Sequence, residues 1–405
     1  MMKSVGSSEA QPPVATQGSA GVILAEPKGA YFYMDAMRTI FALVVAFGHV
    51  WALLIRDYQP TANLAVQATY FTAGFGHQAV ILFFVLSGFW ISRSVVRSAA
   101  RGWSWRGYLV DRLTRLLPVL IATLAIGGML DAIALYWLRS PTHLGLTDTY
   151  VLRTTVAANL SWEVLLGNLA FLQILIKPFG TNGPLWSLSY EFWFYIWFPA
   201  LWLAFRHRRP SLALITLAFG WFVPTLALAF LSWLCGAAVY GIAEWLSERQ
   251  PLSRSNQPLS RSKAWALLAL TGAVLVTALV LTRFGADTWK DPALAVAFSA
   301  FLLSMIVVNP GTITTFRPLA IYGARASFSF YATHFPVMAF AAALAIDSQR
   351  LPPDGHGVTL VILTLLASLA FAWLFAAQTE GRTDTLRRFF QRKHDDLAHP
   401  RRKEE

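Results

Sequence analysis

The feature that most constrains this chain is a series of apolar segments that recurs along almost its whole length. Most of them are near the roughly 20 residues that a helix needs to cross the hydrocarbon core of a bilayer. Hydrophobic residues make up 56% of the 405 residues, and charged residues make up only 13%. A water-soluble domain does not have this composition. The sequence therefore predicts an all-α fold, a polytopic membrane helix bundle.

We expect about ten transmembrane helices. The expected spans are 36–55, 78–96, 113–137, 184–205, 211–223, 230–246, 264–282, 292–308, 320–346 and 357–378. The segment 161–176 is apolar but short, so an interfacial helix, a re-entrant helix and an eleventh span stay open. If the N-terminus is cytoplasmic, most of the 33 lysines and arginines fall on the inside, as the positive-inside rule requires. Both termini are then cytoplasmic, and we expect a multi-pass protein of the plasma (inner) membrane.

Three regions are expected: a tail over 1–30, a membrane domain over 31–380 and a charged cytoplasmic tail over 381–405. The first tail is rich in Ser, Ala, Gly and Pro and lacks the apolar core of a signal peptide, so we expect disorder. The polar segment 247–263 is typical of a flexible linker. The single cysteine, Cys235, forms no internal disulfide, and no metal cluster is expected. The net charge of +12 follows from the positive-inside bias, so the bilayer, and not nucleic acid, is the expected partner.

The first span carries a polar stripe. Arg38 and His49 lie eleven residues apart, which brings them within about 20° of one helix face and about 16 Å apart along the axis. Asp35 precedes Arg38 by three residues and can pair with it. Ionisable groups at membrane depth usually mark a site, and an imidazole suits a general base. The alternative is that Arg38 and His49 only reach toward the lipid headgroups.

Two further motifs follow, one inside the second expected span and one at the start of the third. Ser87 and Gly88 interrupt the apolar run FFVLSGFWISRS, which suits either a polar site or simple close packing. Arg112 and Arg115 are three residues apart at the expected cytoplasmic start of the span 113–137. Two guanidinium groups on one face suit the oxygens of a phosphate. The alternative is ordinary anchoring at the inner headgroups.

The segment FGTNGPLWSLSYEFWFYIWFP places a carboxylate in an aromatic helix. Residues 181–184 are typical of a turn, and the helix that follows carries Ser189 and Glu191 in its first two turns. Glu191 has no cation nearby in the sequence, so we expect a tertiary partner such as an imidazole that it orients. A glutamate satisfied near the membrane interface is the alternative.

A late span carries a second histidine. Ser327, Tyr331 and His334 follow one another at i, i+4 and i+7, so they share a helix face. With the helix entering from the cytoplasm, His334 lies roughly in the middle of the bilayer. A histidine that only packs or donates a hydrogen bond is the alternative.

Together these segments resemble acyltransferase family 3, a family of integral membrane O-acyltransferases, over roughly 33–380. The first span resembles the family's Asp-x-x-Arg motif with ten residues between arginine and histidine. FFVLSGF, Arg-x-x-Arg, WSLS-x-E and S-x-S-x-Y-x-x-H follow in the family's order at 83–89, 112–115, 186–191 and 327–334. Ala36 and Met37 stand where family members often have Gly and Leu.

The resemblance implies a reaction. Acyl-CoA, with acetyl-CoA expected, would enter from the cytoplasm as co-substrate, and no metal is involved. Its phosphates would meet Arg38, Arg112 and Arg115. His49 would act as base on an acceptor hydroxyl or would briefly carry the acyl group, with Glu191 orienting it. The supporting residues would be Asp35, Ser87, Ser189, Tyr331 and His334.

The acceptor is the least constrained part. A sugar hydroxyl in a cell-surface or exported glycan, or in a glycolipid, is expected. Acylation of a small molecule such as a macrolide sugar stays open, because the loop 138–183 carries no distinctive signature. A transporter or flippase that uses the Arg–His stripe as a path is the alternative from a different class.

Overall fold

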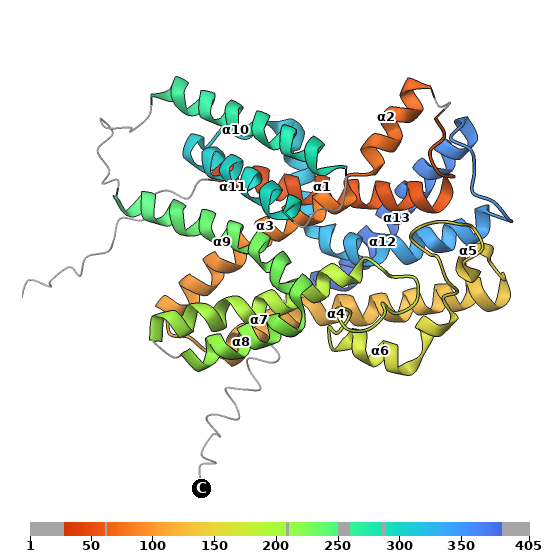
Figure 1. Ribbon diagram of the computed structural model, residues 1–405, viewed down its shortest axis with the longest axis horizontal. Helices are drawn as coiled ribbons and strands as arrows, with labels where there is room; N and C mark the ends of the chain where they lie inside the picture. The colour runs from red at the N-terminus through yellow and green to blue at the C-terminus, as the bar shows by residue number, and fades with distance from the viewer. Residues whose placement is uncertain (1–27, 61–62, 208–209, 250–259, 285–288, 383–405) are drawn as a thin grey trace, which may run out of the picture.

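The structure is a computed structural model that describes residues 28–60, 63–207, 210–249, 260–284 and 289–382. Its named elements are all helices (Figure 1). The long ones are α1 (Lys28–Leu54), α3 (Gly76–Ala100), α4 (Trp105–Ala132), α7 (Leu185–His207), α9 (Pro224–Arg249), α10 (Arg261–Thr282), α11 (Lys290–Val308), α12 (Ala324–Ala345) and α13 (Gly355–Gln378). The short ones are α2 (Leu64–Ala73), α5 (Pro141–Leu144), α6 (Trp162–Leu169) and α8 (Pro210–Phe222). The predicted all-α fold is confirmed.

Every expected span contains a helix, but the count of ten stays a prediction. Within the described residues, eight helical stretches are long and apolar enough to cross a membrane, and α7 and α8 are not among them. Helix α8 has only 13 residues. Helix α7 has 23 residues, and its first turns carry serines and Glu191. These two helices pack against each other.

The segment 161–176 is not an eleventh span. Only eight of its residues form a helix, α6, which at 1.5 Å per residue is about 12 Å long. The rest of the segment consists of turns. The interfacial and re-entrant interpretations both remain compatible with this length.

The helix that contains the third expected span starts before that span. Helix α4 begins at Trp105 and not near 113, because the Ser104 side chain caps it by accepting a hydrogen bond from Gly107 N. Arg112 and Arg115 therefore lie in the third turn of α4 and not at its end. The linker 247–263 and the tails 1–30 and 381–405 fall mostly outside the described residues.

Helices α1 and α12 form the centre of the bundle. Helix α1 packs against α3, α12 and α13, and α12 also packs against α4 and α13. In Figure 1, α10 and α11 lie beside each other on one side of this centre, whereas α4, α5 and α6 lie on the other. Residues from the first, third, fourth, seventh and twelfth helices can therefore meet in one place.

Helices α3 and α9 approach each other through glycines. A Cβ atom on Gly88 would lie 2.0 Å from the carbonyl oxygen of Trp233. A Cβ atom on Gly236 would lie 1.8 Å from the carbonyl oxygen of Val85. Gly88 is thus required for close packing, and Ser87 beside it is buried against the same helix.

Candidate active site

A cavity between α1, α3, α4, α7 and α12 gathers most of the polar motifs. The empty volume of this cavity, including the part that is open to the outside, is about 760 Å³. The polar residues that line it are Arg38, Ser87, Arg115, Ser187, Glu191, Tyr195, Ser327 and Tyr331. The apolar lining includes Phe83, Phe84 and Phe328. Five of the sequence-predicted residues (Arg38, Ser87, Arg115, Glu191 and Tyr331) therefore meet in one cavity, although they come from five different helices.

Two guanidinium groups reach this cavity. Arg38 Nη1 lies 3.7 Å from Asp35 Oδ1 on the same helix, which confirms the predicted pair. About a quarter of the Arg38 side chain is exposed, and Arg115 is exposed as well. Because an arginine stays charged, the two groups provide a positively charged wall for an anion.

Arg112 does not share that wall. Its Nη2 donates a hydrogen bond to Ser94 Oγ at 2.6 Å. Its guanidinium carbon lies 5.3 Å from the ring centroid of Tyr108 and 5.7 Å from that of Tyr195. Arg112 is absent from the residues that line the cavity. The structure thus does not bring Arg112 together with Arg38 and Arg115, because Ser94 and two aromatic rings engage it.

Glu191 is held by hydroxyl groups. Ser87 Oγ donates to its Oε1 at 2.9 Å, and the hydroxyl of Tyr195 donates to the same oxygen. Trp233 Nε1 in turn donates to Ser87 Oγ at 3.2 Å. Within the described residues the hydrogen-bond partners of Glu191 come from α3 and α7 and not from His49, so the expected role of Glu191 in orienting His49 stays a prediction. Tyr195 was missed, although its i+4 position relative to Glu191 is the signal that places both on one face.

A second hydroxyl pair lies on the opposite wall. Ser187 Oγ and the Tyr331 hydroxyl are 2.5 Å apart. Each also lies within hydrogen-bond distance of the Pro184 carbonyl, at 3.1 and 3.2 Å. The predicted turn at 181–184 is present, and α7 starts directly after it. The turn thereby fixes the Tyr331 hydroxyl from α12 against the first turn of α7.

The two membrane-embedded histidines contact each other. His49 Nδ1 on α1 lies 3.0 Å from His334 Nε2 on α12. Their rings are nearly parallel, at 11° and with centroids 5.3 Å apart. His334 is buried, whereas His49 is only partly buried. The sequence placed each histidine on its own helix but did not predict that they pair.

Backbone carbonyls determine which ring nitrogens of the two histidines are protonated. His334 Nδ1 lies 2.7 Å from the Tyr331 carbonyl and 3.2 Å from the Phe330 carbonyl. Since a carbonyl oxygen only accepts, Nδ1 of neutral His334 is the protonated nitrogen and Nε2 is an acceptor. His49 Nδ1 must then donate to it. The Nε2 atom of neutral His49 is left with a free lone pair, which is what a general base needs.

The histidine pair adjoins the cavity through Tyr331. The His334 and Tyr331 ring centroids are 5.7 Å apart, and Tyr331 lines the cavity. His49 packs edge-on against Phe335, at 5.1 Å between centroids. The arrangement thus consists of a cavity lined by two arginines and a neighbouring histidine pair, and Tyr331 contacts both.

Ser189 lies in the second turn of α7, as expected, but away from the cavity. It is fully buried, and its Oγ donates to the Phe171 carbonyl at 2.5 Å. Trp193 Nε1 donates to the same carbonyl at 3.1 Å. Phe171 has a positive φ of 57°, and its ring stacks on Phe192. Ser189 therefore fixes the loop after α6 on α7 and does not line the cavity.

A buried acid–histidine pair also escaped the sequence analysis. His143 Nε2 lies 3.2 Å from Asp131 Oδ1, and both side chains are almost fully buried. Asp131 also accepts hydrogen bonds from Thr181 N at 2.7 Å and Thr181 Oγ1 at 2.9 Å. Since Thr181 starts the turn before α7, this pair holds the entry to the helix that carries Glu191. No motif links the two residues in sequence, so only tertiary packing reveals them.

One more carboxylate lies near the arginines. Glu380, just after α13, accepts hydrogen bonds from Ser329 Oγ at 2.5 Å and Ser329 N at 2.9 Å. Burial raises the pKa of this carboxyl above its ordinary value, although the hydrogen bonds from Ser329 and the charges of Arg115 and Arg38 oppose the rise. Within the described residues, no group of three or more His, Cys, Asp or Glu side chains is placed to hold a metal ion.

Comparison with protein families shows which family the chain belongs to. The family model described as an acyltransferase domain, that of acyltransferase family 3, matches residues 31–377. The chain belongs to acyltransferase family 3. The comparisons with curated proteins and with solved structures gave no match. The resemblance inferred from the five motifs is thus confirmed, and the acyltransferase family 3 domain runs from Tyr31 in α1 to Ala377 in α13.

Proposed function

We propose that this protein is a membrane O-acyltransferase that moves an acyl group from acyl-CoA, with acetyl-CoA as the expected donor, to a sugar hydroxyl of a cell-surface or exported glycan. The observation that carries the proposal is the pair of neighbouring sites in one bundle. Arg38 and Arg115 line a cavity, and the histidine pair, in which Nε2 of neutral His49 is unprotonated, adjoins this cavity through Tyr331. Family membership makes the protein an acyltransferase, whereas donor and acceptor are proposed.

The donor is proposed to bind by its phosphates. Coenzyme A carries several phosphate groups, and two guanidinium groups on one wall suit such an anion. Asp35 holds Arg38 in place at 3.7 Å. Glu191, fixed by Ser87 and Tyr195, balances the charge of the two arginines when no donor is bound. In this proposal Arg112 positions Tyr195 and does not touch the donor.

His49 is proposed as the general base. Its Nε2 takes the proton of the acceptor hydroxyl while that oxygen attacks the thioester carbonyl. The carbon–sulfur bond of the tetrahedral intermediate then breaks, and coenzyme A leaves as a thiol with the proton that His49 returns. A transient acyl group on His49 is the second route that the same atom allows. His334 fixes the tautomer in either case.

The location follows from charge and from the place of the base. Arg38 lies in the third turn of α1 and His49 about 16 Å farther along its axis. With both termini in the cytoplasm, the arginines face the cytoplasmic supply of acyl-CoA and His49 lies nearer the outer leaflet. The acceptor would then arrive from the outer side of the plasma (inner) membrane, as a glycan or a lipid-linked sugar would.

The test is turnover of labelled acetyl-CoA by the purified protein in detergent or nanodiscs with a sugar acceptor. Release of free coenzyme A should fall by about 10²-fold or more in His49→Ala, because the base is lost. The matched control is His356→Ala, which removes an exposed histidine at the start of α13 and should leave turnover unchanged. Full activity of His49→Ala, or no turnover of any acyl-CoA by the wild type, would overturn the proposal.

A further inference from the structure

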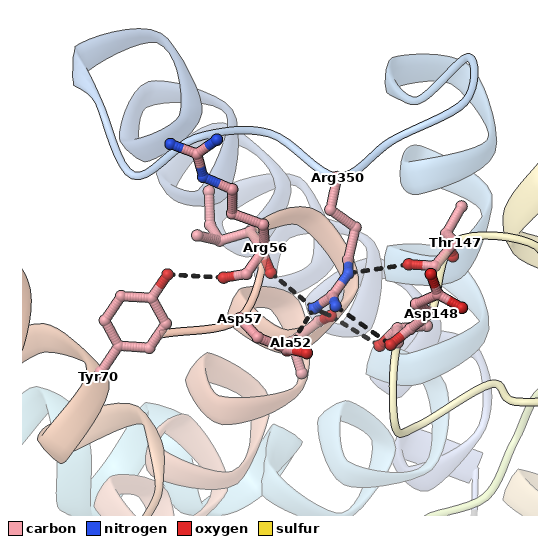
Figure 2. A network of polar contacts seen from close by, with 9 residues as sticks. Ala52, Arg56, Asp57, Tyr70, Thr147, Asp148 and Arg350 are labelled. Atoms are coloured by element: carbon pink, nitrogen blue, oxygen red, sulfur yellow. Dashed lines mark hydrogen bonds and ion pairs between the residues drawn. The ribbon is translucent and has the colours of Figure 1, made fainter. Parts of the chain in front are cut away.

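Arg350 forms a dense set of hydrogen bonds at the end of α1 (Figure 2). Its Nε donates to the Thr147 carbonyl at 3.0 Å, and its Nη2 donates to the Asp148 carbonyl at 3.1 Å. Its Nη1 faces the Ile55 carbonyl at 2.9 Å, the Ala52 carbonyl at 3.4 Å and Asp57 Oδ1 at 2.9 Å. One buried side chain, from the loop that follows α12, thereby joins the end of α1 to the loop that contains Thr147 and Asp148.

The acceptors at α1 are the carbonyls that a helix leaves unpaired at its C-terminal end. Ala52 is three residues after His49, so the hydrogen bond from Arg350 to the Ala52 carbonyl lies within one helical turn of His49. Thr149 Oγ1 donates to the same Ala52 carbonyl at 2.7 Å. The loop around 147–149 and Arg350 thus hold this turn of α1 from two sides.

Arg350 also belongs to the segment that leaves α12, the helix that carries His334. Helix α12 ends at Ala345, five residues before Arg350. Leu351 N donates to the Leu54 carbonyl at 2.8 Å, and Arg56 N donates to the Leu351 carbonyl at 3.0 Å. These two bonds form an isolated parallel bridge between Ile55 and Leu351. The end of the helix that carries His49 is therefore tied to the segment that follows the helix that carries His334.

These contacts occupy the hydrogen-bond donors of the Arg350 guanidinium. Only about 5% of the Arg350 side chain is exposed. Each of its three nitrogens already donates to at least one protein oxygen, and Nη1 faces three. An arginine has five N–H groups, so little is left for a substrate. The role that remains is to hold protein segments in place.

We propose that Arg350 is a positioning residue for the histidine pair. It fixes the end of α1 to the segment that follows α12, and so sets the 3.0 Å contact between His49 Nδ1 and His334 Nε2. That contact selects the His49 tautomer, and a shift of about 1 Å can cost about 10²-fold in rate. The inference rests on the proposed role of His49 as base, and it adds a residue that no motif of the sequence singled out.

The first test compares three substitutions in the purified protein. Arg350→Met should lower kcat about 10- to 100-fold, with KM for acyl-CoA unchanged, because the donor cavity is elsewhere. Arg350→Lys should restore part of kcat, since its ammonium group can still donate to some of the carbonyls. The control is Arg56→Met, because Figure 2 shows the Arg56 guanidinium pointing away from Arg350; its kcat should match the wild type.

A cross-link separates positioning from substrate contact and from loss of folding. Ile55 and Leu351 face each other across the bridge, a spacing that suits a disulfide. In a Cys235→Ser background, Ile55→Cys and Leu351→Cys are added to Arg350→Met. Oxidation should replace the lost tie and raise kcat at least severalfold over the reduced form of the same protein. The reduced protein serves as its own control.

The outcomes are distinguishable. No turnover by the wild type would overturn the proposed function itself. A wild-type kcat in Arg350→Met, or a cross-link that forms without raising kcat, would overturn the positioning role while leaving His49 as base. A rise in KM for the acceptor with kcat unchanged would show that Arg350 touches the substrate, which also contradicts the inference.

Discussion

Single residues acquire their chemistry from backbone atoms in this bundle. His334 is ordinary in sequence terms, yet two carbonyls of its own helix decide which of its nitrogens carries the proton. That choice passes to His49 through one hydrogen bond. The motif predicted both residues and their helix faces, because side-chain periodicity is visible in sequence. The contact itself depends on how α1 packs on α12 and is not visible there.

The role of His334 gives a prediction about a matched pair of variants. His334→Gln keeps an oxygen that can accept from His49 Nδ1, whereas His334→Leu leaves that donor unpaired. We expect kcat to fall at least about tenfold further in His334→Leu than in His334→Gln, because the wrong His49 tautomer becomes populated. KM for acyl-CoA should not change in either. Equal kcat values for the two variants would contradict the tautomer argument.

Glu380 gives a prediction about pH. Because burial raises its pKa in the folded state, the folded protein binds the proton more tightly than the unfolded chain. Stability is then highest below the ordinary carboxyl pKa and falls as pH rises toward the folded-state pKa. In Glu380→Gln the amide oxygen can still accept from Ser329, and the fall should be smaller. Melting curves of both proteins between pH 4 and pH 7 check this, and parallel curves would contradict it.

At the scale of elements, local sequence signals predicted which helices and turns are present better than they predicted where each helix begins and ends. The turn at 181–184 and the helix after it were found correctly, because Gly183 and Pro184 interrupt the helical pattern. Helix α4 begins about two turns before the expected span 113–137, because Ser104 caps it in a polar stretch that apolar composition does not mark. The short α6 could not be told from a span by composition alone, and its length settled the matter.

The contact between α3 and α9 predicts a difference between two glycines. Gly88→Ala would place a Cβ atom 2.0 Å from the Trp233 carbonyl, so we expect a loss of about 1–3 kcal/mol and a lower melting temperature. Gly241→Ala on α9 meets nothing within 4 Å and should leave stability equal or slightly higher. Tryptophan fluorescence during heating measures both. An unchanged melting temperature in Gly88→Ala would mean that the helices can separate without cost.

At the scale of the whole molecule, five motifs scattered over about 300 residues come together around one cavity. The order of the motifs identified the family, because spacing and residue type are properties of sequence. Sequence could not show that Ser87 and Tyr195 donate hydrogen bonds to Glu191 or that aromatic rings engage Arg112. It also could not show that Arg350 joins the end of α1 to the loop at 147–148. Each of these depends on contacts between helices far apart in the chain.

The orientation in the membrane gives a prediction of its own. With both termini cytoplasmic, the loop between α3 and α4 lies inside and the loop between α12 and α13 lies outside. In a Cys235→Ser background, a membrane-impermeant maleimide added to intact cells should label Ser348→Cys and not Ala100→Cys. Both positions are exposed on the protein. The reverse labelling pattern would mean that the bundle is inverted and that the arginine-lined cavity faces away from the acyl-CoA supply.

The central claim is that the bundle separates donor binding from base catalysis. Equilibrium binding of acyl-CoA to the purified protein tests it most directly when turnover is measured on the same samples. His49→Ala should bind with the wild-type Kd and fail to turn over, whereas Arg115→Gln should bind at least about tenfold more weakly. Arg106→Gln, an exposed arginine on the same helix, should match the wild type in both. Wild-type binding by Arg115→Gln, or lost binding in His49→Ala, would contradict the account.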